Sequence, residues 1–266
     1  MRIPRSTLLA GVLTSVLLGG TAHAAAAPAY KPVLTANPVY KSGELDLGTC
    51  QEEQAAPGDP QDVKKYLTGV LDCLNEAWAP KIRKAGYKFS KPSFQVITKL
   101  GAKTGCGRFP AGAQALYCTR NNKITYWLSP DFLRNPDDLR LMAVLAHEYG
   151  HHVQQLTGML DAGTEYTGKN TRRVLDESRR YELQAECLGA AFIGDVWHSL
   201  GRSHDDWYYL VRNNGSGSFL SVFGLKEPGE ETHGGGANVG YWLERGFAKE
   251  SAAACNTWKA PKSKVS

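Results

Sequence analysis

The motif that most constrains this chain is H-E-x-x-H, formed by His147, Glu148 and His151. It lies inside an apolar run at helical spacing that begins at residues 137–138 and ends near Gly158, a typical helix stop. On a helix, two histidines four residues apart present their imidazoles one turn apart on one face. Such a trio is costly to bury without a partner. The motif therefore predicts a metal ion held by both histidines, with Glu148 reaching its water; a polar surface patch is the alternative.

A zinc ion that keeps an open position for water needs a third protein ligand. The extended pattern H-E-x-x-H-x-x-G-x-x-H is not present, because Gln154 and Thr157 occupy the positions of its glycine and third histidine. The metzincin ligand set is therefore excluded, and the third ligand must come from elsewhere in the chain.

A second helix, predicted from about Thr171 to Leu200, offers Glu182 and Glu186 on one face, one turn apart. The rest of that face is small and apolar, and carboxylates there are best explained by metal and histidine partners. We therefore expect Glu182 to be the third ligand and Glu186 to accept a hydrogen bond from a ligating histidine. The alternative is ion pairing with the arginines at residues 179–180.

The N-terminal segment is typical of a secretory signal peptide. A basic start, MRIPR, precedes an apolar run from Ser6 to Gly20 and a small-x-small cleavage site that ends at Ala24. We expect residues 1–24 to be removed and the mature protein to be secreted to the extracellular space; an uncleaved membrane anchor is the alternative. No later segment is apolar enough to predict stable membrane insertion.

All six cysteines lie beyond the expected cleavage site, and an even number in an exported chain predicts three disulfides. None of them forms a C-x-x-C pair, which argues against a cysteine zinc site or a redox dithiol. Sequence proximity favours Cys106–Cys118 and Cys50–Cys73, and Cys187–Cys255 follows by elimination.

The remaining pattern predicts one α+β domain over residues 61–258. Residues 25–60, rich in Pro and Ala, predict an extended lead-in, and residues 259–266 form a basic tail. A helix is expected from Asp62 to Pro80, strands over Ser93–Thr98 and Ile124–Leu128 with a glycine-rich loop (101–112) between them, and further helices near Asp205–Arg212 and Tyr241–Ala254. Strands followed by several helices, without alternation, favour an α+β class.

Several runs resemble the bacterial family of neutral zinc metallopeptidases: HEYGHHVQ, then ELQAE about thirty residues later, then THG before GYWLERGF. The resemblance covers most of residues 60–250. The chain departs from the family pattern at Glu186, where the family has Asp, and at His233-Gly234-Gly235, where the family usually has HGT or HGS. The resemblance implies a zincin-like, gluzincin-like domain: a small sheet packed on an active-site helix, the third ligand on the following helix, and further helices.

These residues predict a secreted zinc metalloendopeptidase that holds one Zn²⁺ per chain and acts on a peptide or protein substrate. Glu148 would be the general base, and His233 is our candidate for a catalytic donor to the oxyanion, with a capping or packing role as the alternative. Two other functions use the same residues: a zinc hydrolase of a non-peptide or cell-wall amide, and a catalytically idle zincin-like binding module. A serine esterase is excluded because no G-x-S-x-G elbow is present. The mild formal charge of +5 gives no support for nucleic-acid binding, and the oligomeric state is not encoded in any of these patterns.

Overall fold

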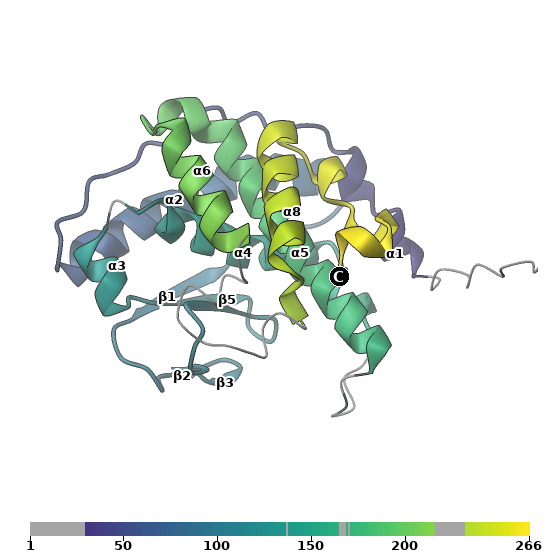
Figure 1. Ribbon diagram of the computed structural model, residues 1–266, viewed down its shortest axis with the longest axis horizontal. Coiled ribbons are helices and arrows are strands. Elements are labelled where there is room, and N and C mark those ends of the chain that lie inside the picture. Colours follow the sequence, from purple (N-terminus) through teal and green to yellow (C-terminus); the bar gives the residue numbers. More distant parts are fainter. Residues whose placement is uncertain (1–29, 137, 165–168, 170, 216–231) are drawn as a thin grey trace, which may run out of the picture.

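The computed structural model describes residues 30–136, 138–164, 169, 171–215 and 232–266 (Figure 1). The expected signal peptide (1–24) and Asp137 lie outside these residues. The described chain is a mixed fold of helices and small sheets, in line with the expected α+β class.

The described α-helices are α1 (Pro32–Thr35), α2 (Pro60–Lys84), α3 (Pro130–Arg134), α4 (Leu139–Leu156), α5 (Arg172–Val196), α6 (His204–Gly215) and α8 (Gly236–Lys249). The strands are β1 (Ser93–Ile97), β2 (Lys103–Thr104), β3 (Gly107–Arg108), β4 (Ala115–Cys118) and β5 (Lys123–Trp127). Short 3-10 helices are η1 (Pro38–Lys41), η2 (Leu160–Ala162), η3 (Trp197–Ser199), η5 (Ala252–Cys255), η6 (Thr257–Lys259) and η7 (Lys262–Lys264).

The larger sheet has the order β1-β5-β4, with β1 parallel and β4 antiparallel to β5. Helix α4 packs against it, and the Tyr126 hydroxyl of β5 donates a hydrogen bond to the Leu141 carbonyl of α4 at 3.2 Å. In Figure 1 the strands lie in the lower part of the view, with α2, α6 and α8 above them. Strand β4 was not predicted, and it forms an edge of this sheet. The predicted glycine-rich loop contains the β2–β3 hairpin.

Helices α4 and α5 form the centre of the molecule. Helix α4 begins after Asp138, whose side chain accepts a hydrogen bond from the Arg140 backbone, and it ends before Gly158, whose φ of 71° favours glycine. Every residue from Leu183 to Gly194 of α5 is buried, so this stretch lies in the protein interior. The helix is shorter than the predicted range of 171–200, because its last turn tightens into η3.

Two glycines bring the backbones of α4 and α5 into close contact. A Cβ atom on Gly150 would lie 2.7 Å from the Ala185 carbonyl oxygen, and one on Gly189 would lie 2.8 Å from the Ala146 carbonyl carbon. Both distances are shorter than real Cβ contacts, so a side chain at either position would force the helices apart. The contacts lie beside the H-E-x-x-H turn, and they set the separation between that turn and α5.

Helices α2 and α8 also differ from their predicted bounds. Helix α2 continues through Pro80 to Lys84, although an interior proline costs about 3 kcal/mol. Ile82, in the extra turn, is fully buried, which is worth about 1.5–3 kcal/mol and offsets most of that cost. Helix α8 occupies 236–249 instead of 241–254, so it begins and ends five residues earlier than predicted.

Both ends of the described chain pack on the core. The segment predicted as an extended lead-in contains α1 and η1, and it buries Leu34, Val39 and Leu45, whose irregular spacing gives no periodic signal. At the other end, the basic tail is docked: Val265 is fully buried, and the Gly235 amide donates to the Ser266 carbonyl at 3.0 Å. The tail thus borders the start of α8.

All six cysteines are paired, as Cys50–Cys73, Cys106–Cys118 and Cys187–Cys255. These are the pairings that the sequence favours. The first ties the N-terminal segment to α2, the second ties the β2–β3 turn to β4, and the third ties α5 to η5.

Candidate metal centre

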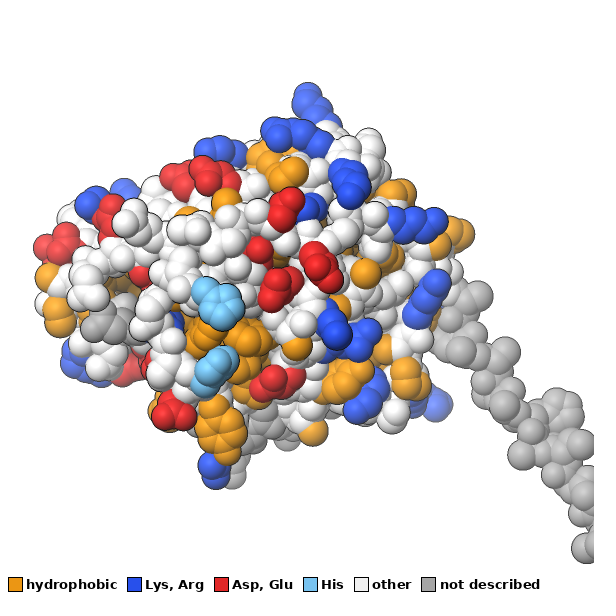
Figure 2. Space-filling view, turned by 90° about the horizontal axis from the view of Figure 1, so that it is seen from above, with side chains coloured by type: hydrophobic (Ala, Val, Ile, Leu, Met, Phe, Trp, Pro, Cys, Tyr) orange, Lys and Arg blue, Asp and Glu red, His pale blue; other side chains and the backbone are white. Residues whose placement is uncertain are grey.

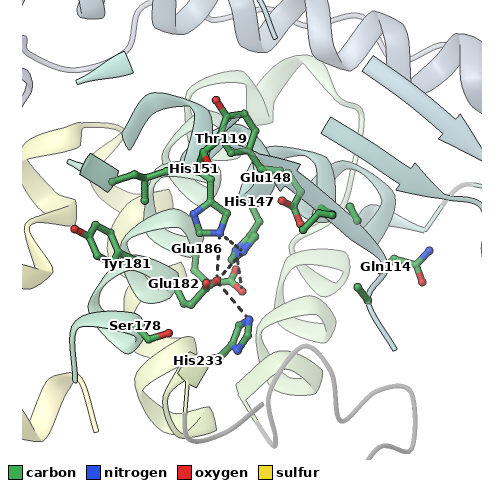
Figure 3. Close-up of a pocket in the computed structure, with 15 residues that line it drawn as sticks. Gln114, Thr119, His147, Glu148, His151, Ser178, Tyr181, Glu182, Glu186 and His233 are labelled. Atoms are coloured by element: carbon green, nitrogen blue, oxygen red, sulfur yellow. Dashed lines mark hydrogen bonds and ion pairs between the residues drawn. The ribbon is translucent and has the colours of Figure 1, made fainter. Parts of the chain in front are cut away.

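The H-E-x-x-H motif lies in the middle of α4, where His147 and His151 point the same way (Figure 3). Their Nε2 atoms are 3.2 Å apart, and both side chains are largely buried. The helical spacing predicted by the sequence therefore brings the two imidazoles to one point.

Glu182 on α5 completes this group. Its Oε2 atom lies 3.2 Å from the Nε2 atom of His147 and 3.2 Å from that of His151. Among the described residues, these three side chains are the group of His, Cys, Asp and Glu that could hold a metal ion. The alternative for α5, pairing with the neighbouring arginines, is not what the structure shows: Arg180 pairs with Asp176, and Arg179 donates to the Val265 carbonyl.

The opposite ring nitrogens contact side chains that orient the two imidazoles toward the centre, through an ion-pair contact for His147 and a hydrogen bond for His151. The Nδ1 atom of His147 lies 3.3 Å from Oε1 of Glu186, and the Nδ1 atom of His151 lies 2.9 Å from Oε1 of Gln154. Both partners are acceptors, and with a proton on each Nδ1 atom the two rings would present their Nε2 lone pairs to a bound cation. Glu186 thus lies where the sequence predicted it, behind a candidate ligand.

This donor set fits zinc. Two imidazole nitrogens and one carboxylate oxygen converge at one point, and with a proton on each Nδ1 atom all three would face a common cation with lone pairs. Ligands about 2.0 Å from a tetrahedral zinc ion lie roughly 3.3 Å from one another, close to the 3.2 Å separations found here. His147, His151 and Glu182 would hold the ion, and three protein ligands leave a position open for water.

The electrostatics of the site favour positive charge. Burial lowers the pKa of His147, but Glu186 and Glu182 outweigh burial and hold that pKa well above its usual range. Burial raises the pKa of Glu182, but His233, His151 and His147 outweigh it and hold this pKa well below its usual range. Glu182 is therefore ionised, and the imidazoles beside it are stabilised by its charge.

Glu148 is buried beside the centre and is not one of the three candidate ligands. Burial raises the pKa of Glu148, against the opposing effects of His147 and His151 and of a hydrogen bond with the Tyr117 backbone. In Figure 3 its carboxylate points away from Glu182, toward the side of the pocket on which Gln114 lies. Its carboxylate lines the cavity and is not part of the group that could hold a metal ion.

These residues open into a cavity of about 440 Å³. Its walls are the β4 edge and adjoining residues on one side and α4, α5 and the loop before α8 on the others. The lining residues are Ala113, Gln114, Ala115, Leu116, Tyr117, Thr119, His147, Glu148, His151, Leu160, Ser178, Tyr181, Glu182, Glu186 and His233.

His233 lies at this cavity and its Nε2 atom is 3.4 Å from Oε2 of Glu182. Its Nδ1 atom lies 2.9 Å from the Thr232 hydroxyl. The next residue, Gly234, has a φ of 84° and fits tightly against Leu183 of α5, which favours glycine at this turn.

Sequence reasoning missed two kinds of residue at the site. Gln154 was noted only as a departure from another ligand pattern, although its position three residues after His151 places it on the same helix face. Tyr117 was missed with the whole of β4. Its hydroxyl lies 3.0 Å from Nδ1 of His152, a fully buried residue whose Nε2 donates to the Ser90 carbonyl. His152 therefore links α4 to the sheet and does not face the cavity.

Comparison with known proteins identifies the family. The family described as "Putative neutral zinc metallopeptidase" matches residues 29–206, which include α4 and α5 with all three candidate ligands. The chain belongs to this family. Membership confirms the resemblance found in the sequence and implies zinc as the metal.

The chain is also 25% identical over 243 residues to the uncharacterized protein YpfJ of Escherichia coli strain K12, covering 85% of this chain and 79% of that protein. The YpfJ protein of E. coli O6:H1 matches with the same identity and coverage. No solved structure matches the chain.

Proposed function

We propose that the protein is a secreted zinc-dependent metalloendopeptidase with a gluzincin-like ligand set. The observation that carries this proposal is the convergence of His147, His151 and Glu182 at 3.2 Å with the unliganded carboxylate of Glu148 beside them. When bound, one zinc ion per chain supplies the Lewis acidity that lowers the pKa of water and polarises a scissile carbonyl.

Glu148 is the general base. Its carboxylate takes a proton from the attacking water and then gives a proton to the leaving amine, so no covalent intermediate is needed. The burial that raises the pKa of Glu148 brings this carboxyl nearer to the range in which it both accepts and donates a proton. A metal site with a purely structural role would not require the Glu148 carboxylate.

His233 is the candidate donor to the developing oxyanion. It approaches the centre from the segment before α8, where Thr232 and His233 are helical, and its Nε2 atom faces the carboxylate of Glu182 (Figure 3). Because Gly234 is held against α5, the imidazole has a defined position when substrate arrives.

A peptide is favoured as the substrate by strand β4. This strand is an edge of its sheet, and residues 113–117 and 119 line the cavity. An extended peptide can add to such an edge through main-chain hydrogen bonds, with its scissile bond near Glu148. An open edge accepts chain on both sides of that bond, which favours an endopeptidase over an exopeptidase.

The finer fold assignment follows from the same arrangement. A small sheet packs on α4, α4 carries the two histidines, and α5 carries the third ligand. We propose that this is a zincin-type domain.

An oxidising location is supported by the three disulfides, which persist outside the cytosol. In the part of the chain that the structure describes, no helix is long and apolar enough to cross a membrane. On the face shown in Figure 2, Asp and Glu side chains lie among the Lys and Arg side chains, so that face lacks the continuous basic surface that nucleic acid requires. A secreted protein acting on peptides agrees with these features.

The test is Glu148→Gln, which keeps the size of the side chain and removes the base. We expect this variant to fold and bind one zinc per chain, and to lose about 10²–10⁴-fold in peptide hydrolysis. Glu76→Gln, an exposed change on α2, is the matched control and should hydrolyse peptides normally. Undiminished hydrolysis by the Glu148 variant at full zinc occupancy would overturn the mechanism.

A further inference from the structure

Two buried glutamines connect the candidate ligand His151 to the far side of α5. Gln154 on α4 and Gln184 on α5 are both fully buried, and Gln154 accepts a hydrogen bond from His151 Nδ1 at 2.9 Å. An amide group can be turned either way, so its oxygen faces the histidine only if other contacts decide the orientation.

The orientation of Gln154 is decided by a backbone carbonyl. Its Nε2 atom lies 2.8 Å from the Tyr181 carbonyl oxygen and 3.1 Å from Oε1 of Gln184. A carbonyl can only accept, so the NH₂ group must face Tyr181 and the amide oxygen must face His151. This bond also ties α4 to the residue immediately before Glu182.

The orientation of Gln184 is decided in the same way and independently. Its Nε2 atom donates to the Cys255 carbonyl at 3.0 Å and to the Tyr40 hydroxyl at 2.8 Å. The Tyr40 hydroxyl in turn donates to the Leu34 carbonyl at 2.9 Å. The oxygen of Gln184 is thereby left to accept from Gln154. Each group in this series therefore donates to the next, from His151 through Gln154, Gln184 and the Tyr40 hydroxyl to the Leu34 carbonyl.

We propose that Gln154 and Gln184 form a directed chain of buried amides that holds His151 as the Nδ1–H tautomer and presents its Nε2 lone pair to the metal. Both are positioning residues. The partner that orients a metal-bound histidine is commonly a carboxylate or a backbone carbonyl. Here a neutral amide orients His151, while the carboxylate of Glu186 faces His147. The two histidines therefore have one negatively charged partner between them, where two carboxylate partners would give two.

The proposal rests on the zinc site of the proposed function and not on peptide hydrolysis. Gln154→Met keeps the volume of the side chain and removes the acceptor, and Gln184→Met removes one of the contacts that orient it. The matched control is Asn75→Leu, because Asn75 is a buried amide that accepts from the Tyr149 hydroxyl of α4 at 3.0 Å, outside the cavity lining. All three variants lose a buried hydrogen bond, but only Gln154→Met and Gln184→Met remove a member of the hydrogen-bonded amide series.

Zinc affinity is measured by competition with a chelator, and exchange of the His151 Nδ1–H proton is measured by nitrogen-15 NMR with and without zinc. We expect Gln154→Met to bind zinc about 10–100-fold more weakly and to exchange this proton faster, Gln184→Met to show smaller losses of the same kind, and Asn75→Leu to show neither. Zinc affinity of Gln154→Met within about threefold of the unchanged protein, with slow exchange retained, would overturn the proposal.

The two proposals fail separately. A protein that binds zinc and shows a slowly exchanging His151 proton but cleaves no peptide contradicts the proposed function and supports the amide chain. If the protein binds no zinc, the proposed function fails, and the exchange of this proton in Gln154→Met still decides whether the glutamines orient the ring.

Discussion

The close contact between α4 and α5 predicts an unusual response to Gly189→Ala. In the middle of a helix, replacing glycine by alanine ordinarily stabilises by about 1 kcal/mol. At Gly189 the new Cβ would lie 2.8 Å from the Ala146 carbonyl carbon and 2.9 Å from the His147 nitrogen. Ordinary contacts begin at 3.4 Å, so the two backbones must separate by about 0.6 Å.

Overpacking of this kind costs about 1–3 kcal/mol, which offsets or exceeds the gain in helix propensity. The control is Gly69→Ala in α2, where a Cβ would meet nothing within 4 Å and the full gain of about 1 kcal/mol is expected. The difference in unfolding free energy between the two variants therefore measures the steric cost alone. It should be about 1–3 kcal/mol, or about 2–4 °C in Tm for each kcal/mol.

The separation also moves His147 relative to Glu182, because the clash falls on the backbone of His147 itself. Zinc affinity of Gly189→Ala should fall on the order of tenfold, similar to the effect of removing a hydrogen-bond partner of a metal ligand. Zinc affinity of Gly69→Ala should not change. Denaturant unfolding of the zinc-free protein and chelator competition give the two quantities. The reasoning is refuted if Gly189→Ala stabilises the protein as much as Gly69→Ala does.

Three further outcomes are expected. Replacing both cysteines of the Cys187–Cys255 disulfide by serine should lower the free energy of unfolding by about 4 kcal/mol, because this bond closes a loop of 68 residues; a loss below about 1 kcal/mol in denaturant unfolding would contradict this. Burial raises the pKa of Tyr66 and of Tyr126 well above the usual 10.0. Their folded pKa exceeds the unfolded one, so the contribution of these two tyrosines to stability should be constant below about pH 10 and fall above it, and tyrosinate absorbance should rise together with unfolding; titration of both phenols in the folded protein near pH 10 would contradict this. Deleting residues 264–266 should release the loop before α8 and lower kcat with zinc affinity unchanged; an unchanged kcat would separate the tail from catalysis.

The candidate ligands could be predicted because they depend on local periodicity. His147 and His151 share a helix face by spacing alone, and Glu182 and Glu186 stand out as carboxylates on an apolar stripe. The structure brings all four together. The cysteine pairings could also be predicted, because two of the three disulfides join residues that are near in sequence and the third then follows by elimination.

The features that the sequence did not predict depend on tertiary packing. Strand β4 has four residues and no clear alternation, so its assignment depends on pairing with β5. The roles of Gln154 and Gln184 depend on carbonyl groups from distant parts of the chain. Pro80 was expected to end α2, but the burial of Ile82 decides the local conformation there.

Both ends of the described chain contact residues that lie behind or beside the candidate metal centre. Tyr40, near the start, accepts from Gln184, and residues 264–266 border the turn that carries His233. Because synthesis proceeds from the N-terminus, α4 and α5 with the candidate ligands are made well before residues 264–266. The segment that carries His233 can therefore gain its contact with Ser266 only after α4 and α5 are complete.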